Sequence, residues 1–273
     1  MNIVRNVAVL SLSMAGGAAA QNGSDYECVI TPRVSVELGS SESGVLAELL
    51  VERGDRVEQG QLVAALDSDV EVLTAELTRL RAHSDVELQS SRVQADYRSR
   101  ELQRLDDLRS DGAVPEQVYD EAAIERQLAD LALESRRVEQ QSAQIEYQRA
   151  QANLSRRRMT SPVTGVVVEV RMAEGEYVYE QSAVMTIAQV DPLYVECFVP
   201  VARFGEIENG MWAEVRPEDP IDETFRAQVV VVDQVFDAAS RTFGVRLELP
   251  NADYGLPAGL RSTVRFLSDP AVP

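Results

Sequence analysis

The sequence has 273 residues, a length that allows two or three small domains. Its composition is that of a folded protein, with 45% hydrophobic and 26% charged residues. The formal net charge of -19 argues against a nucleic-acid partner, because few basic groups are available to neutralise a row of phosphates. All 26 basic residues are arginine, which we attribute to codon bias rather than to function.

The N-terminus has the pattern of a secretory signal peptide. Arg5 precedes a short apolar run, Val7–Met14, and small residues follow, with Ala18 and Ala20 fitting a signal-peptidase site. This run is too short for a membrane-spanning helix. We therefore expect cleavage after Ala20 and a mature protein in the periplasm.

One stretch of sequence occurs twice. Ser43–Leu66 aligns without a gap with Thr164–Ile187, so that the turn glycine Gly54 corresponds to Gly175. Residues 28–38 before the first copy alternate in polarity and are predicted to form a strand. Short strands with glycine turns are typical of small β-barrels or sandwiches. The intervening segment of different character predicts one β-domain split by an insertion.

The insertion is predicted to be an antiparallel helical hairpin. Residues 70–109 contain no proline or glycine, and neither do residues 116–158, so each segment is expected to form one long helix. Pro115 fits the first position of the returning helix. Apolar residues repeat every seven positions, as expected of a coiled-coil seam: Leu73 and Leu80, then, after a register shift, Leu88, Ala95 and Leu102; and Ile124, Leu131, Val138, Ile145 and Ala152.

The C-terminal part is predicted to be all β. After Asp191-Pro192, apolar strands alternate with Gly, Pro and Asn turns, which suits a six-stranded β-barrel. Cys28 and Cys197 lie just outside the two copies of the repeat. In an oxidising compartment they can form a disulfide, and the alternative is two buried free thiols.

The predicted fold class is therefore mixed α and β. Its parts are a signal peptide (residues 1–20), the first half of the β-domain with the preceding strand (28–68), the hairpin (69–158), the second half of the β-domain (159–190) and the barrel (191–268).

In this order, the parts resemble a periplasmic adaptor subunit, or membrane fusion protein, of RND-type tripartite efflux pumps in the HlyD-like superfamily. The resemblance rests on SGVLAELLVERGDRVEQGQLVAAL, RMTSPVTGVVVEVRMAEGEYV and VDQVFDAASRTFGVRLELPNADYGLPAGL. The last stretch matches the barrel pattern of the family through Asp237, Arg241, Thr242, Val245, Arg246, Asn251, Leu256 and Gly259. It implies a split lipoyl/biotinyl-like β-domain, interrupted by the hairpin and followed by the barrel.

The resemblance implies assembly rather than chemistry. Such adaptors form rings, usually of six copies, and join an inner-membrane transporter to a TolC-type outer-membrane channel. The hairpin tip is implied to contact the channel, which makes Arg104, Leu108, Gly112 and Pro115 the candidate contacts. Arg104 and Leu108 match the tip pattern of the family, whereas Pro115 replaces its serine. Without such a role, Arg104 is a solvated charge and Leu108 a coiled-coil residue.

The residues argue against two other classes of function. A lipoyl or biotinyl carrier needs a lysine to hold its cofactor, and the chain has none, so no cofactor is expected. An enzyme is disfavoured, because one histidine, His83, and two cysteines supply no usual triad or zinc set. An adaptor of an ABC-type exporter or a type I secretion system, or a periplasmic scaffold without an efflux role, remains an alternative.

Overall fold

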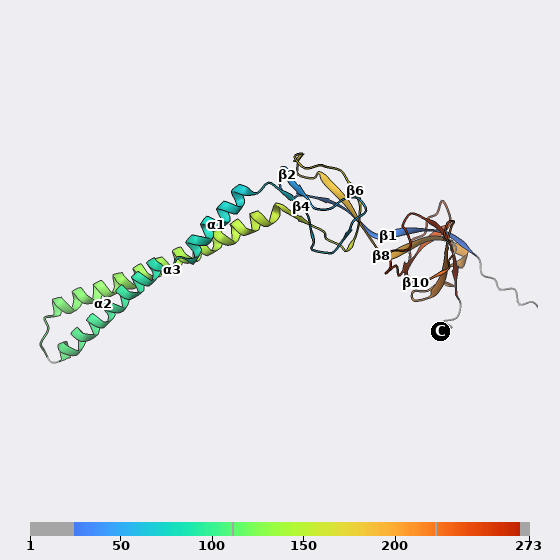
Figure 1. The fold of residues 1–273 in the computed structure, drawn as a ribbon. Helices are drawn as coiled ribbons and strands as arrows, with labels where there is room; N and C mark the ends of the chain where they lie inside the picture. The colour runs from blue at the N-terminus through green and yellow to red at the C-terminus, as the bar shows by residue number, and fades with distance from the viewer. Residues whose placement is uncertain (1–24, 111, 222, 268–273) are drawn as a thin grey trace, which may run out of the picture. The chain divides into compact units, whose positions relative to one another are not determined.

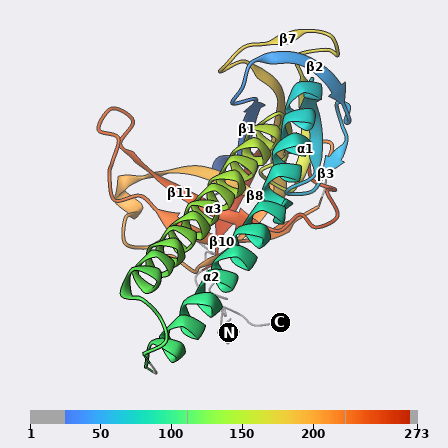
Figure 2. The ribbon, with the colours of Figure 1, turned by 90° about the vertical axis from the view of Figure 1, so that its left-hand side faces the viewer.

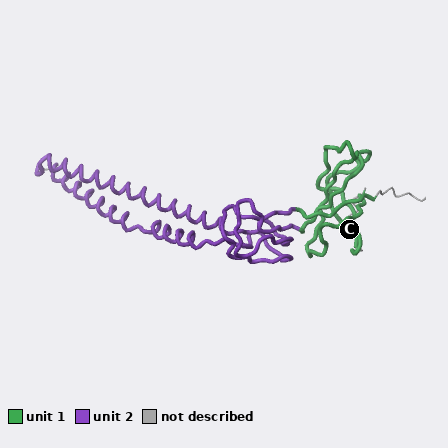
Figure 3. Tube along the Cα trace, turned by 90° about the horizontal axis from the view of Figure 1, so that it is seen from above, with its two compact units in different colours: residues 1–33, 190–273 green, residues 34–189 purple. Residues whose placement is uncertain are grey.

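The computed structural model describes residues 25–110, 112–221 and 223–267 (Figure 1). The predicted signal peptide, residues 1–20, lies outside them. The described residues form two compact units (Figure 3). One consists of residues 34–189, and the other combines the described parts of residues 1–33 and 190–273. The fold is mixed α and β, with a long helical hairpin and a β-barrel, as the sequence predicts.

The elements follow one another in the order β1 (Tyr26–Gly39), β2 (Gly44–Leu49), β3 (Arg56–Val57), β4 (Leu62–Leu66), α1 (Asp69–His83), α2 (Val86–Ser110), α3 (Glu116–Arg156), β5 (Arg158–Thr160), β6 (Gly165–Val170), β7 (Tyr177–Val178), β8 (Ala183–Pro200), the 3-10 turn Val201–Arg203, β9 (Trp212–Pro217), β10 (Phe225–Val232), β11 (Thr242–Leu249) and β12 (Arg261–Phe266).

The two copies of the repeat interlock through reciprocal pairing. Strand β2 of the first copy pairs with β7 of the second, and β3 of the first pairs with β6 of the second. The amide of Gly54 donates to the carbonyl of Val167, and the equivalent amide of Gly175 donates to the carbonyl of Leu46, both at 2.8 Å. Each half therefore completes the hydrogen bonding of the other. We call this structure, formed by β2–β7 and the start of β8, the β-module.

The core of the β-module is equally symmetric. Its buried aliphatic residues occupy equivalent positions in the two copies: Leu46, Val57, Val63 and Leu66 in the first, and Val167, Val178, Val184 and Ile187 in the second. Because both halves supply the same core, neither can bury its apolar face alone. The first and last residues of the helical insertion are thereby brought to the same β-module.

The insertion folds as a hairpin in which α1 and α2 both lie alongside α3 (Figures 1 and 2). The predicted continuous first helix is wrong, because α1 ends at His83 and α2 begins at Val86. Ser84 between them is extended, with φ -78° and ψ 114°. Two heptads span 14 residues, but the buried residues Ala82 and Ala95 are only 13 positions apart. The break between α1 and α2 compensates for the missing residue.

The seam of the hairpin is built from alanines, not from the predicted apolar stripes. Ala75, Ala82, Ala95, Ala122, Ala129 and Ala150 are its buried residues. The predicted seam residues Ile124, Leu131, Val138 and Ile145 are instead 59%, 61%, 58% and 59% exposed, and Leu73 and Leu80 are 66% and 58% exposed. Only the Leu88, Ala95 and Leu102 part of the prediction is confirmed, with Ala95 buried and the two leucines half-buried. Alanine repeats with the same period, so periodicity alone did not identify the seam.

The other unit is a six-stranded barrel, but one of its strands is β1, which lies outside the predicted barrel range of residues 191–268. Its strand order is β1-β12-β9-β10-β11-β8, and an additional pairing of β1 with β8 completes the cycle. Phe243, Leu193, Leu247 and other apolar side chains fill its interior. Cys28 of β1 and Cys197 of β8 form a disulfide with an S–S distance of 2.04 Å and a Cα–Cα distance of 4.4 Å.

The barrel residues that carry the family resemblance have structural roles. The carboxylate of Asp237 accepts hydrogen bonds from the amides of Ala239 and Ser240, which lowers its pKa below the ordinary value of 3.8. These bonds fix a turn in which Arg241 has a positive φ of 56°. The buried side chain of Asn251 donates to the carbonyls of Val190 and Leu256 and accepts from the amide of Leu256.

Glycine is required at the equivalent turns of the two copies. Gly54 and Gly175 have φ values of 97° and 86°, and a β-carbon at either position would meet no atom within 4 Å. We expect Gly54→Ala and Gly175→Ala each to lower the free energy of unfolding by about 1 kcal/mol, since alanine disfavours the left-handed region. Urea denaturation followed by circular dichroism measures the change.

The matched control for these variants is Gln181→Ala. Gln181 already holds a positive φ, of 71°, with a side chain present, so its replacement should leave stability nearly unchanged. If the two glycine variants were as stable as the unmodified protein, glycine would not be required at these two turns.

Candidate functional site at the hairpin tip

The tip of the hairpin is a short loop between α2 and α3. Gly112 has a φ of 71°, and its amide donates to the carbonyl of Arg109 at 3.0 Å. The amide of Ala113 donates to the carbonyl of Leu108 at 3.2 Å. A left-handed glycine after the last turn is a common way for a helix to end, because it lets following amides satisfy the free carbonyls.

A cation–π contact joins the two helices at the tip. The guanidinium of Arg109 lies 4.4 Å from the centre of the Tyr119 ring and 3.4 Å from the carboxylate of Glu116. At an exposed site such a contact contributes about 0.5–1 kcal/mol, so the two helix ends are held together beyond the loop itself. The sequence analysis did not predict this pair. The feature that could have indicated it is an arginine and a tyrosine in the helical turns on either side of the loop.

The four predicted tip residues lie at this end of the hairpin. Leu108 is 49% exposed in the last turns of α2, and Arg104 is exposed one turn before it. Gly112 lies in the loop. Pro115 is predicted from the sequence to be the first residue of the returning helix, but it is the N-cap residue of α3, with φ -61° and ψ 142°, one position before the first helical residue, Glu116. The four residues thus span the final turns of α2, the loop and the start of α3.

The opposite end of the hairpin is anchored on the β-module by Arg157. Its guanidinium binds the carboxylate of Glu71 in α1 at 2.6 Å and the carbonyls of Ser43 and Asp67 at 3.3 and 3.4 Å. The Arg157 and Glu71 side chains are only 22% and 23% exposed. A β-carbon on Gly44 would lie 2.7 Å from this guanidinium, so glycine at that position leaves room for it.

Ion pairs between the helices set their register. Arg98 of α2 binds Glu125 of α3 at 2.8 Å, and Arg136 of α3 binds Glu87 of α2 at 2.9 Å. Arg98 also binds Glu101, and this hydrogen bond is the main reason that the pKa of Arg98 is raised. Exposed pairs of this kind contribute little stability each, but they favour one alignment of the two helices over its neighbours.

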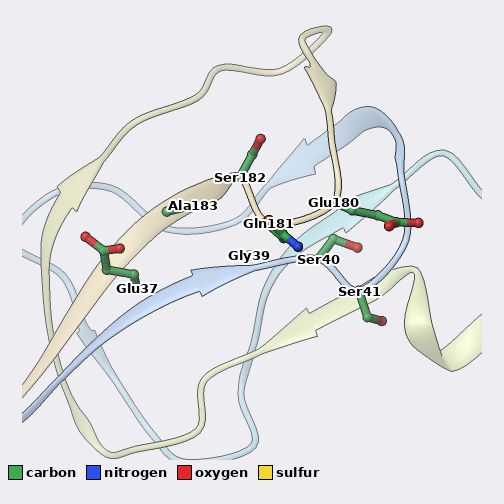
Figure 4. A pocket seen from close by; sticks show the side chains of 8 residues that line it. All are labelled: Glu37, Gly39, Ser40, Ser41, Glu180, Gln181, Ser182 and Ala183. Carbon is green, nitrogen blue, oxygen red and sulfur yellow. The ribbon is translucent and has the colours of Figure 1, made fainter.

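A shallow pocket of about 470 Å³ lies in the same unit as the hairpin (Figure 4). Its lining comes from the end of β1 and the turn before β8: Glu37, Gly39, Ser40, Ser41, Glu180, Gln181, Ser182 and Ala183. Glu37 is already paired with Arg171 at 2.8 Å, and Ser40 accepts a hydrogen bond from the amide of Glu42. Because these groups serve local structure, we assign no chemistry to this pocket.

The described residues offer neither a metal-binding cluster nor a membrane-spanning helix. No cluster of three or more His, Cys, Asp or Glu residues suited to a metal ion occurs among them. None of the helices in the described part of the chain is both long and apolar enough to cross a membrane.

Several curated proteins are similar to the chain. It is 26% identical to a membrane protein of Acidithiobacillus ferridurans, UPF0194, over 85% of this chain and 83% of that protein. It is 27% identical to the pyoverdine export membrane fusion protein PvdR of Pseudomonas putida over 67% of this chain, which corresponds to 48% of PvdR. It is 26% identical to the macrolide export protein MacA of Yersinia pestis, over 80% of this chain and 60% of that protein.

Family models match both units. A model described as a CzcB-like, barrel-sandwich hybrid domain matches residues 34–189, which is more than half of the chain. The chain belongs to the membrane fusion protein family. A second model, described as a CusB-like, beta-barrel domain, matches residues 192–270 of this membrane fusion protein.

Solved structures share the fold of this membrane fusion protein. MacA from Actinobacillus actinomycetemcomitans superposes with a TM-score of 0.74 at 19% identity, covering 90% of this chain and 81% of that chain. The membrane fusion protein Spr0693 from Streptococcus pneumoniae R6 superposes with a TM-score of 0.61 at 16% identity, covering 90% of this chain and 99% of that chain.

The anchor at the hairpin base can be tested with two neighbouring arginines. Arg157→Ala removes a charge-assisted pair and two carbonyl contacts, and we expect it to lower the free energy of unfolding by about 1–2 kcal/mol. Arg156 pairs with Glu42 at 3.3 Å with its side chain 58% exposed, so Arg156→Ala should cost about 0.5 kcal/mol or less.

Urea denaturation compares the two variants, and amide exchange in α1 reports whether the base of the hairpin has loosened. Equal losses of stability for Arg156→Ala and Arg157→Ala would contradict the anchoring role of Arg157.

Proposed function

We propose that this membrane fusion protein is the periplasmic adaptor of a tripartite efflux system, joining an inner-membrane RND-type transporter to a TolC-type outer-membrane channel. The observation that carries the proposal is the hairpin inserted between two interlocked halves of one β-module. Such an insertion projects a helical tip away from a fixed base, as a bridging protein requires. The role is mechanical, and we assign it no catalytic step.

We interpret the β-module as a split lipoyl/biotinyl-like domain whose halves lie on either side of the hairpin at 69–158. The sequence-predicted halves, 28–68 and 159–190, include residues 28–33 and 190 of the barrel unit, so we assign the halves to residues 34–68 and 159–189. In a carrier domain the connection between the halves presents a lysine for the cofactor. Here that connection is the hairpin, and the chain contains no lysine. The domain therefore holds the base of the hairpin and carries no lipoate or biotin.

The hairpin is long enough to hold its tip far from the β-module. With 41 residues in α3, it extends over about 60 Å at 1.5 Å per residue. An isolated helix of this composition would be marginal in water, but α1 and α2 support α3 along its length. The ion pairs and the alanine seam keep the two sides in one register, so that the tip keeps a fixed position relative to its base.

We assign channel contact to the tip residues Arg104, Leu108, Gly112 and Pro115. The exposure of Leu108 supports this role, because an apolar side chain at the end of a hairpin gains by being covered by a partner. The tip is prearranged by the Arg109–Tyr119 contact and the left-handed Gly112. A loop held in this way loses little conformational freedom on binding.

The proposal also names the class of the inner-membrane transporter. The barrel match to a CusB-like model, whose name refers to RND systems, supports an RND-type partner. Export functions in the names of PvdR and MacA support efflux in general. The predicted signal peptide, residues 1–20, supports a periplasmic location, with the inner membrane reached through the transporter. Several copies are expected to form a ring, for which six is our proposed number.

The proposal is tested by recovering the tagged protein from crosslinked membranes and identifying its partners by mass spectrometry. An RND transporter together with an outer-membrane channel is the expected result. An ABC permease in place of the RND transporter would assign the protein to an ABC-type exporter or a type I system. Recovery of neither a transporter nor a channel would overturn the proposal in favour of a periplasmic scaffold.

The tip assignment predicts a specific loss of efflux. Leu108→Glu places a charge where the channel contact is proposed, so we expect loss of channel recovery and of efflux with the fold unchanged. Leu50→Glu is the matched control, since Leu50 is 52% exposed and lies in the β-module. Drug-susceptibility assays and circular dichroism give the two readouts. Normal efflux in cells carrying Leu108→Glu would refute the tip role.

A further inference from the structure

The tip of the hairpin carries two exposed aliphatic residues. Leu108 of α2 is 49% exposed, and Val118 of α3 is 43% exposed. Leu108 is one of the four predicted contact residues, whereas Val118 is not. In α3 the buried alanine of the seam that lies nearest the tip is Ala122. Val118 therefore lies beyond the seam, and packing between the two helices does not account for an aliphatic residue there.

The contact between Arg109 and Tyr119 shows where these two residues point. Leu108 directly precedes Arg109 in the sequence. In the same way, Val118 directly precedes Tyr119. Arg109 and Tyr119 point towards each other across the hairpin, and one step back along an α-helix turns the side-chain direction by about 100°. Because α2 and α3 run side by side in opposite directions (Figure 2), this step leads to the same side of the hairpin in both helices. Leu108 and Val118 therefore share one face, which we call the tip face.

The opposite face of the tip is polar. One step forward from Arg109 leads to Ser110, and one step forward from Tyr119 leads to Asp120, so both lie on the side away from the tip face. Three steps back lead to Asp106 and Glu116, which lie on that side as well, because three residues make slightly less than one helical turn. We call the side with these three carboxylates the acidic face.

The outer edges of the tip are acidic too. Asp107 lies two residues before Arg109, and Glu121 lies two residues after Tyr119. Two residues turn the side-chain direction by about 200°, so each carboxylate points away from the other helix. The apolar part of the tip is thus a narrow strip between the helices, and it fits a ridge of apolar side chains better than a broad apolar surface.

An arginine without an ion pair adjoins the tip face. Arg104 lies one turn before Leu108 in α2, and residues four apart are neighbours on a helix surface. Arg104 is exposed, and none of the carboxylates in the described part of the chain forms an ion pair with it, whereas Arg98 and Arg109 of the same helix are both paired. Its guanidinium is therefore available to a carboxylate of a partner, which it can bind through two N–H donors.

We propose that the outer-membrane channel binds the tip face and not the acidic face. Leu108 and Val118 pack together against an apolar ridge of the channel, and Arg104 binds one of the channel's carboxylates. Val118 is thereby a contact residue in addition to the four assigned above. The inference rests on the proposed adaptor function and specifies which surface of the tip makes the contact. It also implies selection among channels, because a channel without the carboxylate would leave Arg104 covered and unpaired.

A channel fits the tip face better than a second copy of this chain. Copies in a ring with cyclic symmetry meet through unlike surfaces, so two tip faces do not pack against each other. Within the hairpin, the tip lies farthest from the base, which is where a bridging adaptor meets the protein that it reaches. Two aliphatic side chains and one ion pair make a weak contact for a single copy, and several copies in a ring strengthen it by acting together.

Photo-crosslinking at neighbouring positions distinguishes the two faces. Val118 and Asp120 are two residues apart in α3, so their side chains point about 200° apart. A photoreactive amino acid in place of Val118 or Leu108 should capture the channel in cells that make the full-length protein. The same probe in place of Asp120 or Ser110, on the acidic face, should not.

Each other outcome overturns a stated part of the account. Equal capture of the channel from positions 118 and 120 would refute the one-sided contact and leave the adaptor function standing. Capture from position 108 but not from 118 would remove Val118 from the contact. Capture of a second copy of the chain from positions 108 and 118 would replace the channel by a contact between copies. Capture from none of the four positions would refute both this inference and the tip assignment.

Substitutions at the same two positions of α3 provide an independent test. Val118→Glu should lower recovery of the channel with the tagged protein at least about tenfold, which corresponds to 1.4 kcal/mol of binding free energy, because a carboxylate would be buried against the apolar ridge. Val118→Leu keeps the position apolar and should retain the channel. Asp120→Arg is the matched control, since it reverses a charge on the acidic face and should change recovery less than about twofold.

The ion pair is tested at Arg104. Arg104→Glu should lower recovery of the channel, and Arg104→Lys should retain part of it, because lysine keeps the charge but not the two-pronged geometry. Unchanged recovery with Arg104→Glu would refute the ion pair. Circular dichroism shows whether each variant is folded. Recovery of the transporter should be the same for all variants, so a lost tip contact is distinguishable from failure of the proposed function, in which the unmodified protein recovers no transporter or channel.

Discussion

The structure depends on the reciprocal pairing of the two repeat copies. Gly54 donates to Val167 and Gly175 to Leu46, so the turn of each copy is completed by a strand of the other. Neither copy can form its hydrogen bonds or bury its aliphatic core alone, although nearly a hundred residues separate them in sequence. The interruption is tolerated because a helical hairpin starts and ends at nearly the same place. There Arg157, at the end of the insertion, binds Glu71 near its start and the carbonyl of Ser43 in the β-module.

The proposed bridging role is mechanical, and it follows from this arrangement. The β-module fixes both strands of chain that enter the hairpin, the alanine seam lets the helices approach closely, and the interhelical ion pairs fix their register. With a small-residue seam, the larger aliphatic residues lie exposed on the outer sides of the hairpin. In this membrane fusion protein, two sets of residues therefore recur every seven positions. The alanines form the internal contact between the helices, and the leucine, isoleucine and valine residues lie on the outside.

Much of the fold could be predicted from the sequence. Aligned glycines and aliphatic residues revealed the repeat, and the segments free of glycine and proline revealed the helices. The seam could not be identified, because Ala129 and Leu131 recur with the same seven-residue period and only packing distinguishes them. The break at Ser84 depends on the spacing of the buried alanines, whereas the heptad pattern of the sequence points to the leucines, which are exposed in α1. At the tip, the structure has Leu108 exposed near the end of α2. The Arg109–Tyr119 contact depends on three-dimensional proximity that no spacing rule encodes.

Site-specific photo-crosslinking in cells tests the central claim most directly. A photoreactive amino acid in place of Leu108 should capture an outer-membrane channel protein, and the same probe in place of Leu50 in the β-module should not. This result would place the tip at the channel and the base elsewhere, as a bridging adaptor requires. Capture of the channel from position 50 as efficiently as from position 108, or from neither position, would contradict the account.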